Sequence, residues 1–263
     1  MQRDSVIYTV IFSAILCVVC AILVSTAAVQ LKDLQTANEA LDEQRNVLQA
    51  AGLIAPGDKP TSEEVADFFA ATDVVLVDMQ EGKEVEVDGI DPATYNPLKA
   101  QNDPAMSYRA PQNKASVRRV AQYARVYKFK DDQGTIEKLV LPIEGYGLWG
   151  TLYGFLAIEA DTETVAGITY YRHKETPGLG GEVDNPSWKA LWPGRKLFDE
   201  QGVVALEVIK GAAGSVDSDP YSVDGLSGAT ITGRGVTNML EFWMGPDGFG
   251  PYLENFRQQR SAA

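Results

Sequence analysis

A short segment near the C-terminus gathers hydroxyl side chains among glycines. It reads VDGLSGATITGRGV from Val223 to Val236 and contains Ser227, Thr230 and Thr232, followed by one cation, Arg234. Because the next residues predict a helix, the unpaired N–H groups and positive dipole end near Thr230 would stabilise a phosphate. Arg234, one turn later, would add a charge-assisted contact. A helix cap at Ser227 or Thr230 is the other interpretation that this pattern allows.

Two further glycine-rich clusters precede this segment. The first is PIEGYGLWGTLYG, which contains Trp149, and the second is YYRHKETPGLGGEVDNPSW. Glycine lets a backbone approach a ligand closely, and an aromatic side chain can cover a planar ring. Each cluster alone is equally consistent with a tight turn. The G-x-G-x-x-G spacing at residues 145–150 does not predict a dinucleotide-binding turn, because a strand and not a helix is expected after it.

The sequence gives little indication of a metal site or of acid–base or nucleophilic catalysis. His173 is the only histidine, its nearest acid in the sequence is Glu175, and we expect it to hydrogen-bond to backbone in a loop. The only cysteines, Cys17 and Cys20, lie in the apolar N-terminal segment. This set cannot complete a four-ligand zinc site within the chain, and no G-x-S-x-G nucleophile motif occurs. We therefore expect neither a metal site nor a catalytic residue.

Composition limits the class of protein and the partners. The chain has 263 residues, 45% of them hydrophobic, which is enough for a buried core. Its formal net charge is -13. Nucleic acids and anionic membrane surfaces require a cationic footprint, so we expect neither as a partner.

The N-terminal segment predicts a membrane anchor. Residues 6–29 carry no Asp, Glu, Lys or Arg. As a helix they would extend roughly 36 Å, enough for a bilayer core of about 30 Å. A cleaved signal peptide is the alternative, although its apolar core is normally shorter. Arg3 precedes the segment, and Lys32 follows it beside Asp33. The positive-inside rule therefore gives only a weak indication of the orientation. We expect a cytoplasmic N-terminus and the bulk of the chain outside.

The remaining sequence predicts an α+β fold with one mixed, mainly antiparallel sheet and flanking helices. A membrane-proximal helix is expected to end at Gly52, and Thr61 with Glu64 forms a capping box for the next helix. A hairpin is expected to turn at Asp161–Thr164. Strands are expected at residues 74–79, 117–129, 136–147 and 203–211, and a helix at residues 231–245.

These elements suggest four regions along the chain. Residues 1–31 would hold the cytoplasmic N-terminus and the transmembrane anchor. Residues 32–116 would form membrane-proximal helices and an irregular α+β region, with irregular excursions over residues 82–115. Residues 117–257 would form the domain with the glycine-rich clusters, and residues 258–263 a polar tail.

Four sequence blocks resemble a known family. DGLSGATITGRGV resembles the S/T-G-A-T flavinylation motif of FMN-binding proteins. GYGLWGTLYGFLAI, RHKETPGLGGEVDNPSW and FWMGPDGFGPYLENFR resemble, in the same order, the C subunit of the Na+-translocating NADH:quinone reductase. The resemblance covers residues 142–257, together with the single N-terminal anchor expected of that subunit.

The resemblance implies a covalent flavin. FMN would be joined through its phosphate to the hydroxyl of Thr230 by a separate flavin transferase. The protein would relay electrons from an iron–sulfur centre to the FMN of the B subunit, and it would need no acid–base catalyst of its own. The complex would be a Na+-transporting NADH:ubiquinone reductase of the bacterial inner membrane, with most of this chain in the periplasm. The residues implied around the cofactor are Trp149, Glu175, Thr176, Leu179, Gly180, Lys210, Ser227, Gly228 and Ala229.

Two alternatives to this function stay open. The G subunit of the electron-transport complex Rnf shares the anchor motif and the E-T-P-G loop, whereas GLWG and GFGPYL favour the Na+-pump subunit. The second alternative is a membrane-anchored module that binds a phosphorylated ligand reversibly and without redox chemistry.

Overall fold

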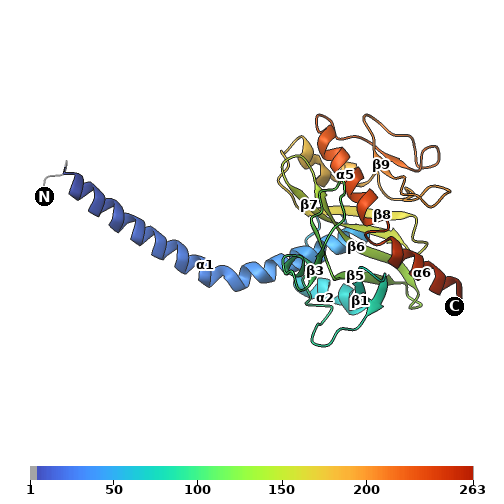
Figure 1. Ribbon diagram of the computed structural model, residues 1–263, viewed down its shortest axis with the longest axis horizontal. Coiled ribbons are helices and arrows are strands. Elements are labelled where there is room, and N and C mark those ends of the chain that lie inside the picture. Colours follow the sequence, from blue (N-terminus) through green and yellow to red (C-terminus); the bar gives the residue numbers. More distant parts are fainter. Residues whose placement is uncertain (1–4, 263) are drawn as a thin grey trace. The chain divides into compact units, whose positions relative to one another are not determined.

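A computed structural model describes residues 5–262 of the chain. Arg3, used above to predict the orientation of the anchor, and Ala263 at the end of the predicted tail lie outside the described residues. The described chain forms two compact units, of which the first ends at Glu43 and the second begins at Gln44. Helix α1 (Val6–Ala50), blue in Figure 1, is the one described helix long and apolar enough to cross a membrane. The predicted anchor and membrane-proximal helix are therefore one continuous helix.

Gly52 ends this long helix, as predicted. Its φ of 73° is a conformation that glycine adopts without strain. The Leu53 N–H donates to the Leu48 carbonyl at 3.0 Å, and the Gly52 N–H donates to the Gln49 carbonyl at 3.1 Å. This pair of bonds is a Schellman motif, which satisfies two carbonyls that the helix leaves unpaired.

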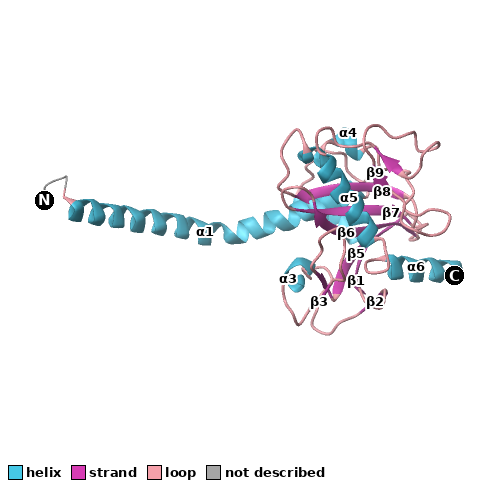
Figure 2. Cartoon of the chain, turned by 45° about the horizontal axis from the view of Figure 1, so that its top comes forward, coloured by secondary structure: helices cyan, strands magenta, loops and turns pink. Residues whose placement is uncertain are grey.

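Within the described chain, the second unit is built on a six-stranded sheet, magenta in Figure 2, whose neighbouring strands are all antiparallel. The predicted fold class and the predicted hairpin are confirmed. Two strands that precede residue 117 belong to this sheet, so the sheet extends across the predicted boundary. The strand order is β2 (Lys83–Val85), β1 (Thr72–Asp78), β5 (Tyr123–Lys130), β6 (Ile136–Tyr146), β7 (Thr151–Glu159) and β8 (Val165–Arg172).

Different helices cover the two faces of the sheet. Helix α5 (Thr230–Trp243) packs on β6, where a Cβ added at Gly145 would lie 2.9 Å from the Cβ of Met239. On the opposite face, the Thr169 hydroxyl of β8 donates to the Asn46 carbonyl in α1 at 3.1 Å. Side chains alternate between the faces of a strand, so these two helix contacts hold the sheet from both sides.

Shorter elements surround the N-terminal half of the sheet. Helix α2 (Ser62–Ala70) begins with the predicted capping box of Thr61 and Glu64. The region predicted to be irregular contains β2, α3 (Pro97–Gln101) and β3 (Ser107–Arg109), which pairs with β4 (Arg119–Ala121). These elements are short, as expected for a segment rich in Pro, Asp and Asn.

The segment between β8 and α5 differs from its prediction. It contains a 3₁₀-helix η1 (Gly180–Asp184), α4 (Pro186–Lys189), β9 (Glu207–Val208) and β10 (Ser222–Val223). The strand predicted over residues 203–211 is wrong except at Glu207–Val208. This stretch packs against α5 and pairs over two residues with β10, in parallel, so most of its backbone has no strand partner in the sheet.

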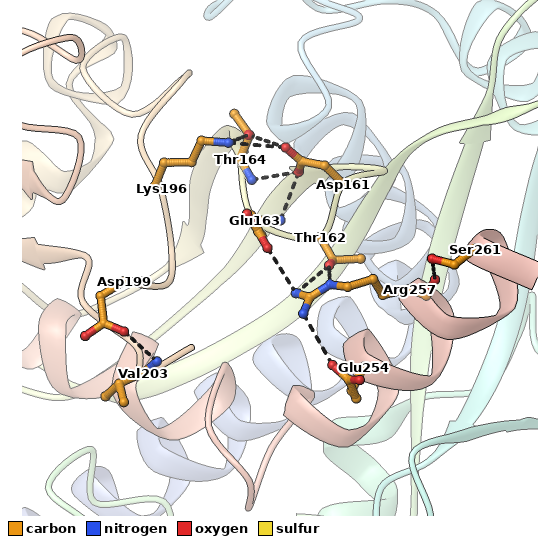
Figure 3. Close-up of polar contacts among 10 residues, drawn as sticks. All are labelled: Asp161, Thr162, Glu163, Thr164, Lys196, Asp199, Val203, Glu254, Arg257 and Ser261. Carbon is orange, nitrogen blue, oxygen red and sulfur yellow. Dashed lines mark hydrogen bonds and ion pairs between the residues drawn. The ribbon is translucent and has the colours of Figure 1, made fainter. Parts of the chain in front are cut away.

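The last helix, α6 (Gly250–Ala262), includes most of the segment predicted as a polar tail. Figure 3 shows how Arg257 of this helix binds the turn between β7 and β8. Its Nε and Nη2 donate to the Thr162 Oγ1 at 3.1 and 3.0 Å. Nη2 lies 3.5 Å from the Glu163 carboxylate, and Nη1 lies 3.3 Å from that of Glu254. One guanidinium thus joins α6 to the hairpin turn.

Asp161 shapes the turn that Arg257 contacts. Its Oδ1 accepts the N–H groups of Glu163 and Thr164 at 2.9 and 2.8 Å. Burial alone would raise the pKa of Asp161, but these hydrogen bonds and the Lys196 ammonium hold that pKa below its usual value. The turn is therefore most stable with this carboxyl group ionised.

We predict that Arg257→Ala lowers the free energy of unfolding by about 1–2 kcal/mol, because a half-exposed charged donor group is lost from the hairpin turn. Urea unfolding of the full chain in detergent measures this change. Gln258→Ala is the matched control, since the Gln258 amide bonds within α6 to Glu254. Equal losses in both variants would contradict the role given to Arg257.

Candidate functional site

Thr230 lies at an uncapped helix start. It is the first residue of α5 and its side chain is exposed, while Ala229 occupies the N-cap position. Among the described residues, no side chain hydrogen-bonds to this end of α5 as a cap. The helix-cap interpretation of Ser227 and Thr230 is therefore wrong. The open N–H groups of the first turn and the positive end of the helix dipole are left to face an anion.

A pocket of about 690 Å³ opens beside Thr230. Its walls come from β9 and the residues after it, from the loop before α5, and from the outer side of α5. Two cations, Lys210 and Arg234, line it together with the carboxyl groups of Glu207 and Asp224. Cations beside a helix N-terminus suit a phosphate group. Four of the predicted site residues line this pocket, namely Ser227, Gly228, Thr230 and Lys210.

The buried carboxylate of Glu175 joins the three glycine-rich segments. Its Oε1 accepts the N–H groups of Leu148 and Trp149, both at 2.9 Å. Its Oε2 accepts the hydroxyl of Thr232, in the first turn of α5, at 2.6 Å. Glu175 is only 5% exposed, so its bond to Thr232 is buried, and its bonds to the exposed residues Leu148 and Trp149 are partly buried. The structure thus gives this predicted flavin neighbour three partners within the protein.

Two glycines make room for this carboxylate. A Cβ added at Gly147 would lie 2.6 Å from Oε1 of Glu175, and one added at Gly180 would lie 2.4 Å from Oε2. Real Cβ atoms do not approach other atoms so closely. Gly147 and Gly180 belong to the clusters that indicated a ligand site, but in the structure they make room for a side chain of the protein itself.

Exposed apolar side chains surround the start of α5. Leu179 lies directly beside the loop that precedes Thr230, since a Cβ added at Gly228 would be 2.8 Å from its Cδ2. Leu179 is 44% exposed, Trp149 63% and Ile231 54%. Trp149 is held near α5 through its N–H bond to Glu175, which also binds Thr232. Exposed apolar side chains of these loops thus lie near the start of α5, and neither Leu179 nor Trp149 is among the residues that line the pocket with Lys210.

The other predicted site residues support this surface. Thr176 is exposed, and its carbonyl accepts the N–H groups of Leu179 and Gly181 at 3.1 and 2.9 Å. Gly180 and Ala229 are buried. The structure therefore divides the predicted residues between an exposed group near Thr230 and a buried group behind it.

His173 has an acid partner that sequence proximity did not reveal. Its Nδ1 accepts the backbone N–H of Glu175 at 3.2 Å, which confirms the expected backbone contact. Its Nε2 lies 2.7 Å from Oδ2 of Asp184, which the 3₁₀-helix brings back toward β8. The described residues contain no group of His, Cys, Asp and Glu side chains arranged to hold a metal ion.

Glu144 supports the first glycine-rich loop from β6. Its carbonyl accepts the indole N–H of Trp243 in α5 at 2.6 Å. Burial raises the pKa of the Glu144 carboxyl group, although the Gln101 amide and the Arg172 guanidinium oppose this change. The end of β6 is thus tied to the last residue of α5, at the opposite end of this helix from Thr230.

Comparisons with known proteins agree with this site. Residues 147–245 match the FMN-binding domain family. The chain is 46% identical, over 98% of each chain, to the C subunit of the Na(+)-translocating NADH-quinone reductase of Pseudomonas aeruginosa. It is 45% identical to that of Yersinia pestis, over 98% of this chain and 95% of the relative. The crystal structure of Shewanella oneidensis NqrC is 34% identical, covers 84% of this chain and 99% of its own, and has a TM-score of 0.77.

Fold and site thus define a protein that carries an FMN-binding domain. The chain belongs to the NqrC family, the C subunits of the Na+-translocating NADH-quinone reductases. The resemblance inferred from the four sequence blocks is confirmed, in favour of this subunit over the G subunit of Rnf.

We predict that Glu175→Ala lowers the free energy of unfolding by about 2–4 kcal/mol, because it leaves the buried Thr232 hydroxyl and two partly buried N–H groups without this acceptor. Glu175→Gln is the matched variant and is expected to cost about 1 kcal/mol, since one of its oxygens still accepts the two N–H groups. Urea unfolding monitored by tryptophan fluorescence compares the two. A Glu175→Ala variant as stable as the native chain would rule out the role assigned to this carboxylate.

Proposed function

We propose that this chain is the electron-carrying subunit of a Na+-pumping NADH:ubiquinone oxidoreductase, with FMN joined by a phosphoester to Thr230. The observation that carries the proposal is the exposed Thr230 hydroxyl at the uncapped start of α5, beside a pocket with two cations. The match of residues 147–245 to the FMN-binding domain family supports the same cofactor. A separate flavin transferase installs the flavin.

The chain's own groups fit the phosphate of such a linkage. The first turn of α5 offers N–H groups and the positive end of its dipole to the phosphate oxygens. Lys210 and Arg234 line the pocket beside Thr230 and neutralise the remaining negative charge. Gly228, with a φ of 69°, turns the backbone sharply ahead of Thr230 and adds no side chain there.

The flavin ring fits the apolar surface formed by Leu179 and Trp149. A planar ring needs apolar contact on its faces and a few polar groups at its edges. Leu179 and Trp149 supply the first, and the exposed Thr176 lies next to them for the second. Glu175 and Gly180 hold this surface from behind, as a rigid support for a site requires.

FMN supplies the redox chemistry when it is bound, so the protein has to hold and orient it without an acid–base catalyst. In the complex, the electron donor is an iron–sulfur centre and the acceptor is the FMN of the B subunit. We place the chain in the bacterial inner membrane through the apolar part of α1. Its N-terminus is then cytoplasmic and the unit that begins at Gln44 is periplasmic.

We predict that the native chain, made in a host with the flavin transferase, gives a fluorescent band on a denaturing gel under ultraviolet light. Thr230→Ala removes the band because the ester oxygen is lost. Ser227→Ala is the matched control: it removes a nearby exposed hydroxyl and keeps the band. A dark band for the native chain would refute the covalent linkage and favour reversible binding of a phosphorylated ligand.

The side of Thr230 on which the ring lies can be tested separately. We predict that Leu179→Ala and Trp149→Ala each increase quenching of the bound flavin by iodide, because they remove apolar cover from the ring. Lys210→Ala, which changes the pocket beside Thr230 and not the apolar side chains, leaves the quenching nearly unchanged. The reverse pattern would place the ring in the pocket lined by Lys210.

A further inference from the structure

His173, at the start of the second glycine-rich loop, makes two hydrogen bonds with different partners. The Glu175 backbone N–H can only donate, so the Nδ1 atom that receives it carries no proton. The ring proton must then be on Nε2, which faces the Asp184 carboxylate at 2.7 Å. A carboxylate commonly selects the tautomer of a histidine in this way. The contacts therefore define one neutral tautomer, with the proton on Nε2.

The bond between His173 and Asp184 also closes a loop. Residues 174–183 between them carry Thr176, Leu179 and the buried Glu175. The loop begins where β8 ends and returns through the 3₁₀-helix that starts at Gly180. The His173 side chain is 16% exposed and that of Asp184 44%, so protein covers most of the imidazole while the carboxylate is open to solvent. One imidazole thus ties together the two ends of the loop and the backbone of Glu175.

We propose that His173 is a positioning residue for the flavin site, which it serves in its Nε2–H tautomer. Its Nδ1 holds the backbone of Glu175, and the Glu175 carboxylate then holds Leu148, Trp149 and Thr232. The position of Trp149 relative to α5 therefore depends on an acceptor at Nδ1. This inference rests on the proposed function only in naming the ligand that the loop receives.

The surroundings of Asp184 suit this arrangement. Burial raises the pKa of the Tyr170 phenol in β8, and the nearby Asp184 carboxylate raises it further. Burial lowers the pKa of the Lys189 ammonium in α4, and Asp184 opposes that change. Lys189 also donates to the Gln49 side chain at 3.1 Å. Both ring nitrogens of His173 have protein partners, so the imidazole holds the loop and is not placed to exchange protons with a ligand.

The tautomer can be measured directly, because His173 is the only histidine of the chain. The full chain labelled with ¹⁵N-histidine, in detergent at neutral pH, should give nitrogen shifts of a protonated Nε2 and an unprotonated Nδ1. The Thr230→Ala variant carries no ester-linked flavin and should give the same shifts. A proton on Nδ1 would overturn the proposal, and this measurement does not depend on whether FMN is bound.

A matched pair of variants tests the positioning role. Asparagine places an acceptor near the site of Nδ1, whereas glutamine places a donor near the site of Nε2. We expect His173→Gln to speed hydrogen exchange of the Leu148–Trp149 segment about five- to tenfold, the effect of losing one hydrogen bond. His173→Asn should stay within about twofold of the native rate.

The same pair separates positioning from overall stability. With the flavin attached, His173→Gln should shift the visible spectrum of the flavin, and His173→Asn should restore the native spectrum. Unchanged exchange in His173→Gln, or equal acceleration in both variants, would refute the role of Nδ1. A dark native band on the denaturing gel would refute only the covalent flavin. The hydrogen-exchange rates and the nitrogen shifts would still test the role of His173.

Discussion

The carboxylate of Glu175 accepts hydrogen bonds from two parts of the chain that are far apart in sequence. Leu148 and Trp149 bind one of its oxygens, and Thr232 at the start of α5 binds the other. A buried donor left without an acceptor costs about 1–3 kcal/mol. The loops and the helix therefore hold one another in place. This one buried group determines where the surface around Thr230 lies.

The residues that support this surface differ from the residues that are exposed on it. The side chains that do the holding are buried, whereas Thr230, Trp149 and Leu179 are exposed on top of them. A bound cofactor benefits from such a division, because the surface that meets it is held rigidly from behind and stays exposed. The opposite face of the sheet is occupied by the last residues of α1, where the Asn46 carbonyl accepts the Thr169 hydroxyl.

Local patterns in the sequence predicted the elements well. The capping box at Thr61, the glycine that ends α1, the hairpin turn at Asp161 and the helix after Thr230 all depend on neighbouring residues. Predictions failed where partners come from elsewhere. Residues 203–211 have the composition of a strand, but in the fold they lie against α5 and find a two-residue partner in β10. The acid partner of His173 was equally hidden, because the chain folds back to bring Asp184 beside it.

By itself, the sequence determined the α+β class and the apolar span, since these depend on composition and periodicity, and its four motif blocks were enough to indicate the family. The tertiary structure alone decided what the glycines and Glu175 do. Gly147 and Gly180 leave space for a buried carboxylate, and the cations Lys210 and Arg234 meet at one pocket beside Thr230. The physical reason is that burial and hydrogen bonding depend on distances between segments, which no local pattern contains.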